Sequence, residues 1–190
     1  IIQQVVAFLR QPVPEPQPLN WWQRLRGMET TPTIEPVSPI IICGIPGTGK
    51  TTMLCNKVNE ILFDNPKAKF LVLTPTNKAA DVVCKKLWDI NSDVFAVRLS
   101  RPTDPELEEE AIYRDVIDEE DIKHINVLAS TIHRLPYFDI QNVGLLFQHQ
   151  WDYVIFDESS MTGLHYMTFA LIALFKSNSN THFIIAGDPK

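Results

Sequence analysis

Cysteine is scarce in this chain of 190 residues. The three cysteines, Cys43, Cys55 and Cys84, are odd in number and form no C-x-x-C pair, which argues against a disulfide framework and against a zinc site built on cysteines. The five histidines are scattered along the chain and show no metal-binding spacing. We therefore expect a protein of a reducing compartment, the cytoplasm.

Long apolar runs and an N-terminal targeting segment are also missing. No run approaches the roughly 18 residues that a membrane-spanning helix needs. The chain begins Ile1-Ile2-Gln3-Gln4, without an initiator Met and without the basic region that opens a signal peptide. Because 190 residues can bury a substantial core, we expect one compact domain. From the start without Met we expect it to be a piece of a longer protein.

Positive charge is not in excess either, since the formal net charge is −6. Residues 104–121 hold ten acidic residues and one Arg, which leaves a charge of +3 on the rest of the chain. The acidity is therefore local and does not exclude a nucleic-acid surface elsewhere. With Asp104 as N-cap and Pro105 in the first turn, this acidic insertion is predicted to be a solvated surface helix without a function of its own, or alternatively a wall that repels nucleic acid toward the opposite face.

What the chain does have is an alternation of apolar strands with helices. Residues 1–39 precede it with a short apolar helix and with prolines at every second position from 12 to 18, which predict an extended strap and an upstream domain boundary. The alternation predicts an α/β fold, a mostly parallel sheet with helices on both faces and functional loops at the carboxyl ends of its strands. The expected strands cover residues 40–43, 70–73, 94–97, 125–129, 152–156 and 183–186, and the main helices cover residues 50–63, 79–88 and 162–175.

The first of these strands runs into a glycine-rich loop with the pattern G-x-x-x-x-G-K-T. Its glycines let successive backbone N–H groups point at phosphate oxygens, and the helix that follows adds the positive end of its dipole. We predict a loop that binds a nucleoside triphosphate, in which Lys50 reaches the β- and γ-phosphates and the Thr51 hydroxyl ligates Mg²⁺. A glycine-rich turn that matches by chance is the alternative. The predicted nucleotide-binding residues of this loop are Gly44, Pro46, Gly47, Thr48, Gly49, Lys50, Thr51 and Thr52.

An acidic pair follows the strand at residues 152–156. Buried apolar residues bring Asp157 to the strand end, where its carboxylate can hold Mg²⁺, and Glu158 is placed to act as general base on the attacking water. A surface turn or a helix cap is the commoner explanation of such a pair on its own. Its combination with the phosphate-binding loop favours catalysis, and Lys50, Asp157 and Glu158 form the predicted catalytic set.

Five segments follow one another along the chain: Gly44 to Thr51, Thr74 to Asp81, Ser130 to Leu135, Asp157 to Met161 and Gly187 to Lys190. This series resembles motifs I, Ia, Ib, II and III of superfamily 1 helicases, and its sequences are most similar to the RecD-like (superfamily 1B) branch. The resemblance implies a RecA-like first motor domain at residues 40–190 that uses ATP and Mg²⁺ to move along single-stranded nucleic acid, with DNA favoured over RNA.

The same resemblance implies which residues contact the single-stranded nucleic acid. Thr74, Thr76, Asn77, Thr131 and His133 would line its track, and short hydroxyl and amide side chains suit contacts with phosphates. The structural alternatives are helix capping by Thr76 and Asn77 and a satisfied, partly buried His133.

Two further assignments follow from the resemblance. Asp188 would couple the nucleotide to the track, the alternative being a simple turn residue before Pro189. The segment around Gln23 resembles the Gln motif, whose carboxamide pairs with adenine. The neighbouring Trp21 and Trp22 are expected to pack the strap onto the domain, the alternative being that one of them stacks on a base.

The chain also departs from the family pattern. It stops at Lys190, where the family continues with a Gln that senses the γ-phosphate and then with a second RecA-like domain that supplies arginines. An arginine finger is worth about 10³–10⁵ in rate. We therefore expect these residues alone to bind Mg·ATP, to hydrolyse it poorly and not to unwind a duplex. The alternatives are an ATP-gated regulatory module without translocation and a small-molecule kinase, which would lack the segments at 74–81 and 131–135.

Overall fold

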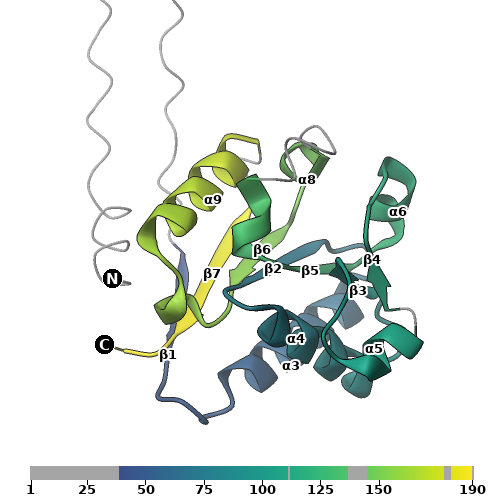
Figure 1. Cartoon of the computed structure of the whole chain (residues 1–190), viewed down its shortest axis with the longest axis horizontal. Helices are drawn as coiled ribbons and strands as arrows, with labels where there is room; N and C mark the ends of the chain where they lie inside the picture. Colours follow the sequence, from purple (N-terminus) through teal and green to yellow (C-terminus); the bar gives the residue numbers. More distant parts are fainter. Residues whose placement is uncertain (1–38, 111, 137–144, 178–180, 190) are drawn as a thin grey trace, which may run out of the picture.

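The computed structural model describes residues 39–110, 112–136, 145–177 and 181–189. Within them, seven strands form one sheet in the order β1-β7-β6-β2-β5-β3-β4, and every pairing is parallel (Figure 1). The strands are β1 (Ile40–Cys43), β2 (Phe70–Thr74), β3 (Ala96–Leu99), β4 (Tyr113–Arg114), β5 (Val127–Thr131), β6 (Tyr153–Phe156) and β7 (His182–Gly187). The helices are α3 (Lys50–Asp64), α4 (Asn77–Ile90), α5 (Pro105–Glu109), α6 (Glu119–His124), α8 (Leu145–Gln148) and α9 (Leu164–Ser177), with 3₁₀ turns η1 (Ile132–Arg134) and η2 (Ser159–Met161).

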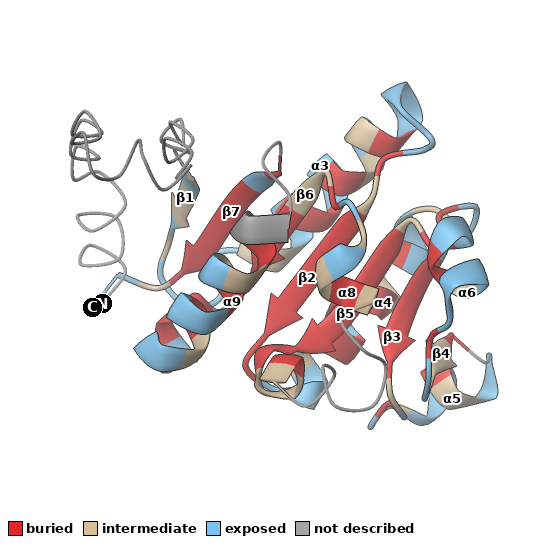
Figure 2. Ribbon diagram, turned by 90° about the horizontal axis from the view of Figure 1, so that it is seen from above, coloured by how far each residue is buried: buried red, intermediate tan, exposed pale blue. Residues whose placement is uncertain are grey.

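Helices cover both faces of this sheet, so its inner strands form a buried layer, whereas the edge strands β1 and β4 are partly exposed (Figure 2). Successive residues of β2 alternate between two cores: Phe70 and Val72 pack with α3 and α4, whereas Leu71 and Leu73 pack with α8 and α9. Burial on both faces explains why the strands are near-continuous apolar runs. The predicted α/β fold, with a parallel sheet between helices, is confirmed. None of the helices in the described ranges is long and apolar enough to cross a membrane.

The predicted elements match the observed ones apart from local shifts. β3 lies two residues later than expected: it begins at Ala96 and continues through the charged Arg98 to Leu99, which the apolar pattern left out. In α4 the buried face contains Ala80, Val83 and Leu87, but Trp88 is 40% exposed and does not belong to it. The expected strap and the segment around Gln23 lie outside the described residues.

The acidic insertion at residues 104–121 is the one element that the sequence analysis described wrongly. Instead of one solvated helix it contains α5, the edge strand β4 and the start of α6. Asp104 and Asp118 cap the two helices, as their side chains accept bonds from backbone N–H groups of the first turns. Four apolar side chains, at every fifth position, are buried beneath the acidic surface: Leu107, Ile112, Ile117 and Ile122. A spacing of five fits neither a helix nor a strand, so the pattern predicted no buried face.

The burial of the cysteines yields a chemical prediction. Burial raises the pKa of the Cys55 thiol to about 12, with a smaller effect from Asp157, and burial likewise raises the pKa of Cys84 to about 12, whereas Cys43 is exposed at the end of β1. The thiolate is the reactive form. At pH 8 a thiol reagent should therefore label Cys43 and leave the other two unmodified in the native protein, as read by peptide mass spectrometry. Equal labelling of all three before denaturation would contradict this burial.

Candidate active site

The glycine-rich loop joins β1 to α3 at the carboxyl end of the sheet. Gly47 and Gly49 have φ values of 81° and 80°, in the left-handed region that other residues enter only at a cost. Gly49 is also the N-cap of α3 and offers no side-chain cap. The first N–H groups of α3 therefore remain available to an anion, which matches the predicted phosphate-binding role of the loop.

The Lys50 side chain folds back over this loop. Its Nζ donates to the carbonyl oxygens of Gly44 (2.8 Å) and Ile45 (3.1 Å) and to Asp188 Oδ1 at 2.6 Å. Only 12% of the Lys50 side chain is exposed, against 33% of Asp188. The predicted phosphate ligand and the predicted coupling residue are thus in direct contact, and an arriving phosphate oxygen competes with the Asp188 carboxylate for the same ammonium group.

Thr51 and Asp157 meet in the same way. The Thr51 hydroxyl donates to Asp157 Oδ2 at 2.7 Å, although the two residues come from α3 and from the end of β6. Asp157 is 2% exposed. No group of three or more His, Cys, Asp or Glu side chains suited to a metal occurs among the described residues. One hydroxyl and one carboxylate are nevertheless the usual protein ligands of an Mg²⁺ ion that is otherwise held by phosphates and water, so the pair fits the predicted metal.

Glu158 follows directly and has an unusual backbone conformation. Its φ of 51° lies in the left-handed region, which costs a residue with a side chain about 1–3 kcal/mol. Its N–H donates to Asp157 Oδ1 at 3.0 Å. Desolvation raises the pKa of the Glu158 carboxyl, the nearby charges of Asp157 and Asp188 raise it further, and Lys50 opposes them. A strained carboxyl group with a raised pKa is typical of a general base.

Two serines that the sequence analysis did not single out connect the acidic pair to β7. Ser159 Oγ donates to the Ala186 carbonyl oxygen at 2.8 Å, and Ser160 Oγ accepts from the Asp188 N–H at 3.3 Å. Both lie in η2 and are buried. They hold Asp188 in a fixed relation to Glu158, which explains how a residue beyond β7 reaches the phosphate-binding loop.

A hollow extends from this cluster toward the start of α4. This hollow joins the predicted nucleotide site to part of the surface that is predicted to contact the single-stranded nucleic acid. Its walls are formed by Thr51, Asp157 and Glu158 on one side and by Thr76, Lys78, Ala79 and Val82 on the other.

The five predicted track residues are not equally accessible. Thr76 and Asn77 are exposed at the start of α4, where the Thr76 side chain accepts the Ala79 N–H at 3.2 Å. Thr74 and Thr131 are paired across β2 and β5 and are buried, and the Thr74 hydroxyl donates to the Thr76 carbonyl oxygen at 2.9 Å. His133 is half-buried edge-on against Tyr166, with ring centroids 4.3 Å apart. Capping by Thr76 and packing of His133 are thus realised, whereas the Asn77 side chain, the other proposed cap, accepts from Arg98 Nη2.

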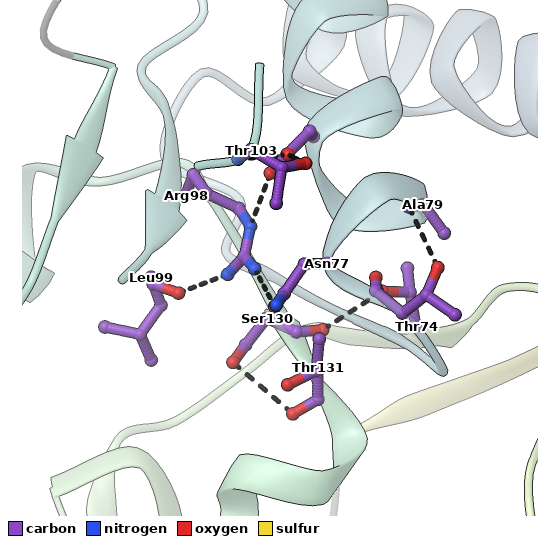
Figure 3. Close-up of polar contacts among 10 residues, drawn as sticks. Thr74, Asn77, Ala79, Arg98, Leu99, Thr103, Ser130 and Thr131 are labelled. Atoms are coloured by element: carbon purple, nitrogen blue, oxygen red, sulfur yellow. Dashed lines mark hydrogen bonds and ion pairs between the residues drawn. The ribbon is translucent and has the colours of Figure 1, made fainter. Parts of the chain in front are cut away.

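A buried ion pair behind the track was also missed by the sequence analysis. Arg98 and Asp81 are 0% and 2% exposed, and Arg98 Nε donates to Asp81 Oδ1 at 2.9 Å (Figure 3). The available signal was an arginine inside an apolar strand, since a charge at such a position requires a partner. Among the other predicted nucleotide-binding residues, Pro46 is exposed, the Thr48 hydroxyl donates to the Ile45 carbonyl oxygen, and Thr52 Oγ1 on α3 accepts from Lys86. The predicted adenine reader Gln23 lies outside the described residues.

One family model and several known proteins match the sequence of this chain. A family model described as an AAA domain matches residues 31–190. The human RNA helicase Mov10l1 is 43% identical over 51 residues, 27% of this chain and 4% of that protein. The DNA replication ATP-dependent helicase/nuclease DNA2 of Saccharomyces cerevisiae is 26% identical over 154 residues, 78% of this chain and 9% of that protein. The chain thus spans less than a tenth of either relative.

Solved structures share the fold at low sequence identity. The SWI2/SNF2 ATPase core of Sulfolobus solfataricus in complex with dsDNA superposes with a TM-score of 0.57 at 16% identity, over 80% of this chain and 28% of that one. Mss116p bound to ssRNA and AMP-PNP superposes with a TM-score of 0.53 at 20% identity, over 78% of this chain and 31% of that one. The chain therefore belongs to the AAA domain family, and its fold is that of a RecA-like core.

Proposed function

We propose that this chain is the first motor domain of a nucleic-acid-dependent ATPase of the RecD-like (superfamily 1B) branch, which couples Mg·ATP hydrolysis to movement along single-stranded DNA or RNA. One observation carries the proposal: Lys50, Thr51, Asp157 and Glu158 converge at one edge of the sheet, with Asp188 bound to Lys50 at 2.6 Å. These are the parts that phosphoryl transfer to water requires, namely a phosphate cradle, a cation, ligands for Mg²⁺ and a base.

Each residue has a separate task in this mechanism. The N–H groups of the first turn of α3 and Lys50 Nζ would hold the phosphates. The Thr51 hydroxyl and the Asp157 carboxylate would hold Mg²⁺, which would neutralise the phosphate charge. Glu158 takes a proton from the attacking water, which its raised pKa favours. When a phosphate binds the Lys50 ammonium group, Asp188 loses its ion-pair partner. The shift of Asp188 then reaches the acidic pair through the hydrogen bond between the Asp188 N–H and Ser160.

The track, the partners and the compartment belong to the same proposal. Thr76 and Asn77, which are exposed, contact the phosphates of the single-stranded nucleic acid, and the other residues predicted for this surface are Thr74, Thr131 and His133. The relatives carry the names of both RNA and DNA helicases, and we expect this protein to prefer single-stranded DNA. A second RecA-like domain supplies the missing arginines, Gln23 reads adenine, and the free thiols suit the cytoplasm.

ATP turnover by the full-length protein, with and without single-stranded DNA or RNA, tests this proposal. We expect strong stimulation by one polymer and a loss of about 10²–10³-fold or more in the Lys50→Ala variant, because the cation on the phosphates is removed. Lys57→Ala is the matched control, since Lys57 lies on the same helix and its exposed ammonium group pairs with the exposed Glu60. Turnover that neither polymer stimulates would contradict a motor function and favour the ATP-gated regulatory module.

A further inference from the structure

Arg98 binds two different residues of α4 from beneath. The residue lies on β3 and is fully buried, at 0% exposure. Its Nε donates to Asp81 Oδ1 at 2.9 Å, its Nη2 donates to Asn77 Oδ1 at 2.7 Å, and its Nη1 donates to the carbonyl oxygen of Leu99 (Figure 3). One guanidinium thus connects the second turn of α4 with the first residue of that helix.

Asp81 fixes the orientation of this guanidinium. Its Oδ2 accepts the backbone N–H of Thr103 at 2.7 Å and also the Thr103 hydroxyl, so the carboxylate is held on both oxygens. The Arg98 Nε–H group therefore points at Asp81. Because the guanidinium is planar, this orientation places Nη2 against Asn77. A lysine ammonium is a single point donor and cannot span both residues in this way.

The contact with Arg98 also decides which atoms Asn77 offers to solvent. An arginine only donates, so the Asn77 atom that faces it is the carbonyl oxygen, and the amide nitrogen takes the opposite position. That nitrogen donates to none of the residues that the structure describes. Asn77 is exposed and stands beside Thr76 and Lys78 at the start of a helix of 14 residues. The side chain thus presents donors, which select an acceptor such as a phosphate oxygen.

We propose that Arg98 is a positioning residue, which holds the Asn77 carboxamide so that its amide N–H groups bind the phosphate backbone of the single strand. The inference rests on the proposed function, because it gives Asn77 a phosphate to bind. The competing explanation is a purely structural ion pair, which would stabilise α4 and leave the binding of the strand unaffected.

The test measures single-strand affinity and ATP-analogue affinity in the full-length protein. Asn77→Ala removes the donor, and we expect single-strand affinity to fall about tenfold, the cost of one hydrogen bond to a charged group. Arg98→Lys keeps the charge beside Asp81 but releases Asn77, and we expect a similar fall. The double variant should bind no more weakly than Asn77→Ala alone, since both changes remove the same contact. ATP-analogue affinity should be unchanged in all three, and Asn56→Ala, at an exposed asparagine of α3, is the control.

Asn77→Asp separates positioning from stability. A carboxylate still accepts from Arg98 and favours the start of a helix, so the thermal midpoint should not fall. The same carboxylate repels a phosphate, so single-strand affinity should fall further than in Asn77→Ala. A variant that is as stable as the unaltered protein and binds the strand normally would overturn the assignment.

The remaining outcomes are also decisive. Normal single-strand affinity in Arg98→Lys, with weak binding in Asn77→Ala, would refute positioning and leave the track in place. Additive losses in the double variant, or a parallel loss of ATP-analogue affinity, would reduce Arg98 to a structural residue. If the unaltered protein binds neither single-stranded polymer, the proposed function fails and this inference fails with it.

Discussion

Glu158→Gln is expected to lower ATP turnover of the full-length protein by about 10²–10⁴-fold while leaving nucleotide affinity unchanged. Glu158 follows Asp157, the proposed Mg²⁺ ligand at the end of β6, and its backbone N–H donates to Asp157 Oδ1 at 3.0 Å. Gln has the same length and meets the same left-handed backbone, with φ near 51°. The substitution therefore removes the proton acceptor and little else.

The raised pKa of Glu158 adds a pH dependence to this prediction. Turnover needs the ionised carboxylate, so it should decline as the pH falls through the raised pKa, at a higher pH than for an ordinary carboxyl group. Stability has the opposite dependence, because a carboxyl whose folded-state pKa exceeds its unfolded value stabilises the fold only when protonated, and that contribution is lost as the pH rises. Glu158→Gln should thus be at least as stable as the unaltered protein at neutral pH.

Single-turnover kinetics and an equilibrium titration with an ATP analogue distinguish the possible results. Ser160→Ala is a useful comparison, since it disturbs the contact with Asp188 and leaves the proposed base in place. Retention of more than about a tenth of the turnover in Glu158→Gln would exclude Glu158 as the base. A large loss of nucleotide affinity would instead indicate that Glu158 shapes the site and does not take the proton.

Periodic signals account for what the sequence predicted well. β6 is buried on both faces, so its apolar run predicted the strand end at which Asp157 lies, whereas β1, which leads into the glycine loop, is apolar but only partly buried. The glycine loop was equally readable, since its two residues with positive φ are both glycines. Local pattern and three-dimensional position agree in these segments.

Long-range pairing was the part that could not be predicted. The contact of Lys50 with Asp188 joins residues 138 positions apart, and nothing local to either residue specifies the other. The burial of Arg98 likewise depends on Asp81, which is 17 positions away on another element. In the acidic insertion, a spacing of five concealed the buried side chains of α5 and α6. Such features depend on the packing of several elements, and a periodicity describes only one.

Asp81→Ala is expected to lower the free energy of unfolding of this chain by about 3–5 kcal/mol. The change leaves the Arg98 guanidinium fully buried with no counter-charge, held only by neutral oxygens of Asn77 and Leu99. It also removes the acceptor of the Thr103 N–H. Because a typical domain is stable by about 5–15 kcal/mol, the loss is a large share of the total. Urea denaturation followed by circular dichroism measures it.

Two comparisons identify the cause of this loss. Asp89→Ala removes an exposed carboxylate from the same helix and should change the free energy of unfolding by no more than about 0.5 kcal/mol. The double variant Asp81→Leu/Arg98→Met replaces both charges by apolar side chains and should be more stable than Asp81→Ala, because the main cost is an unpaired buried charge and not a missing contact. If the double variant is the less stable of the two, the pair itself stabilises the fold. If it is the more stable, an apolar pair would hold α4 against β3, and the ion pair is then explained by the orientation that it gives to Asn77.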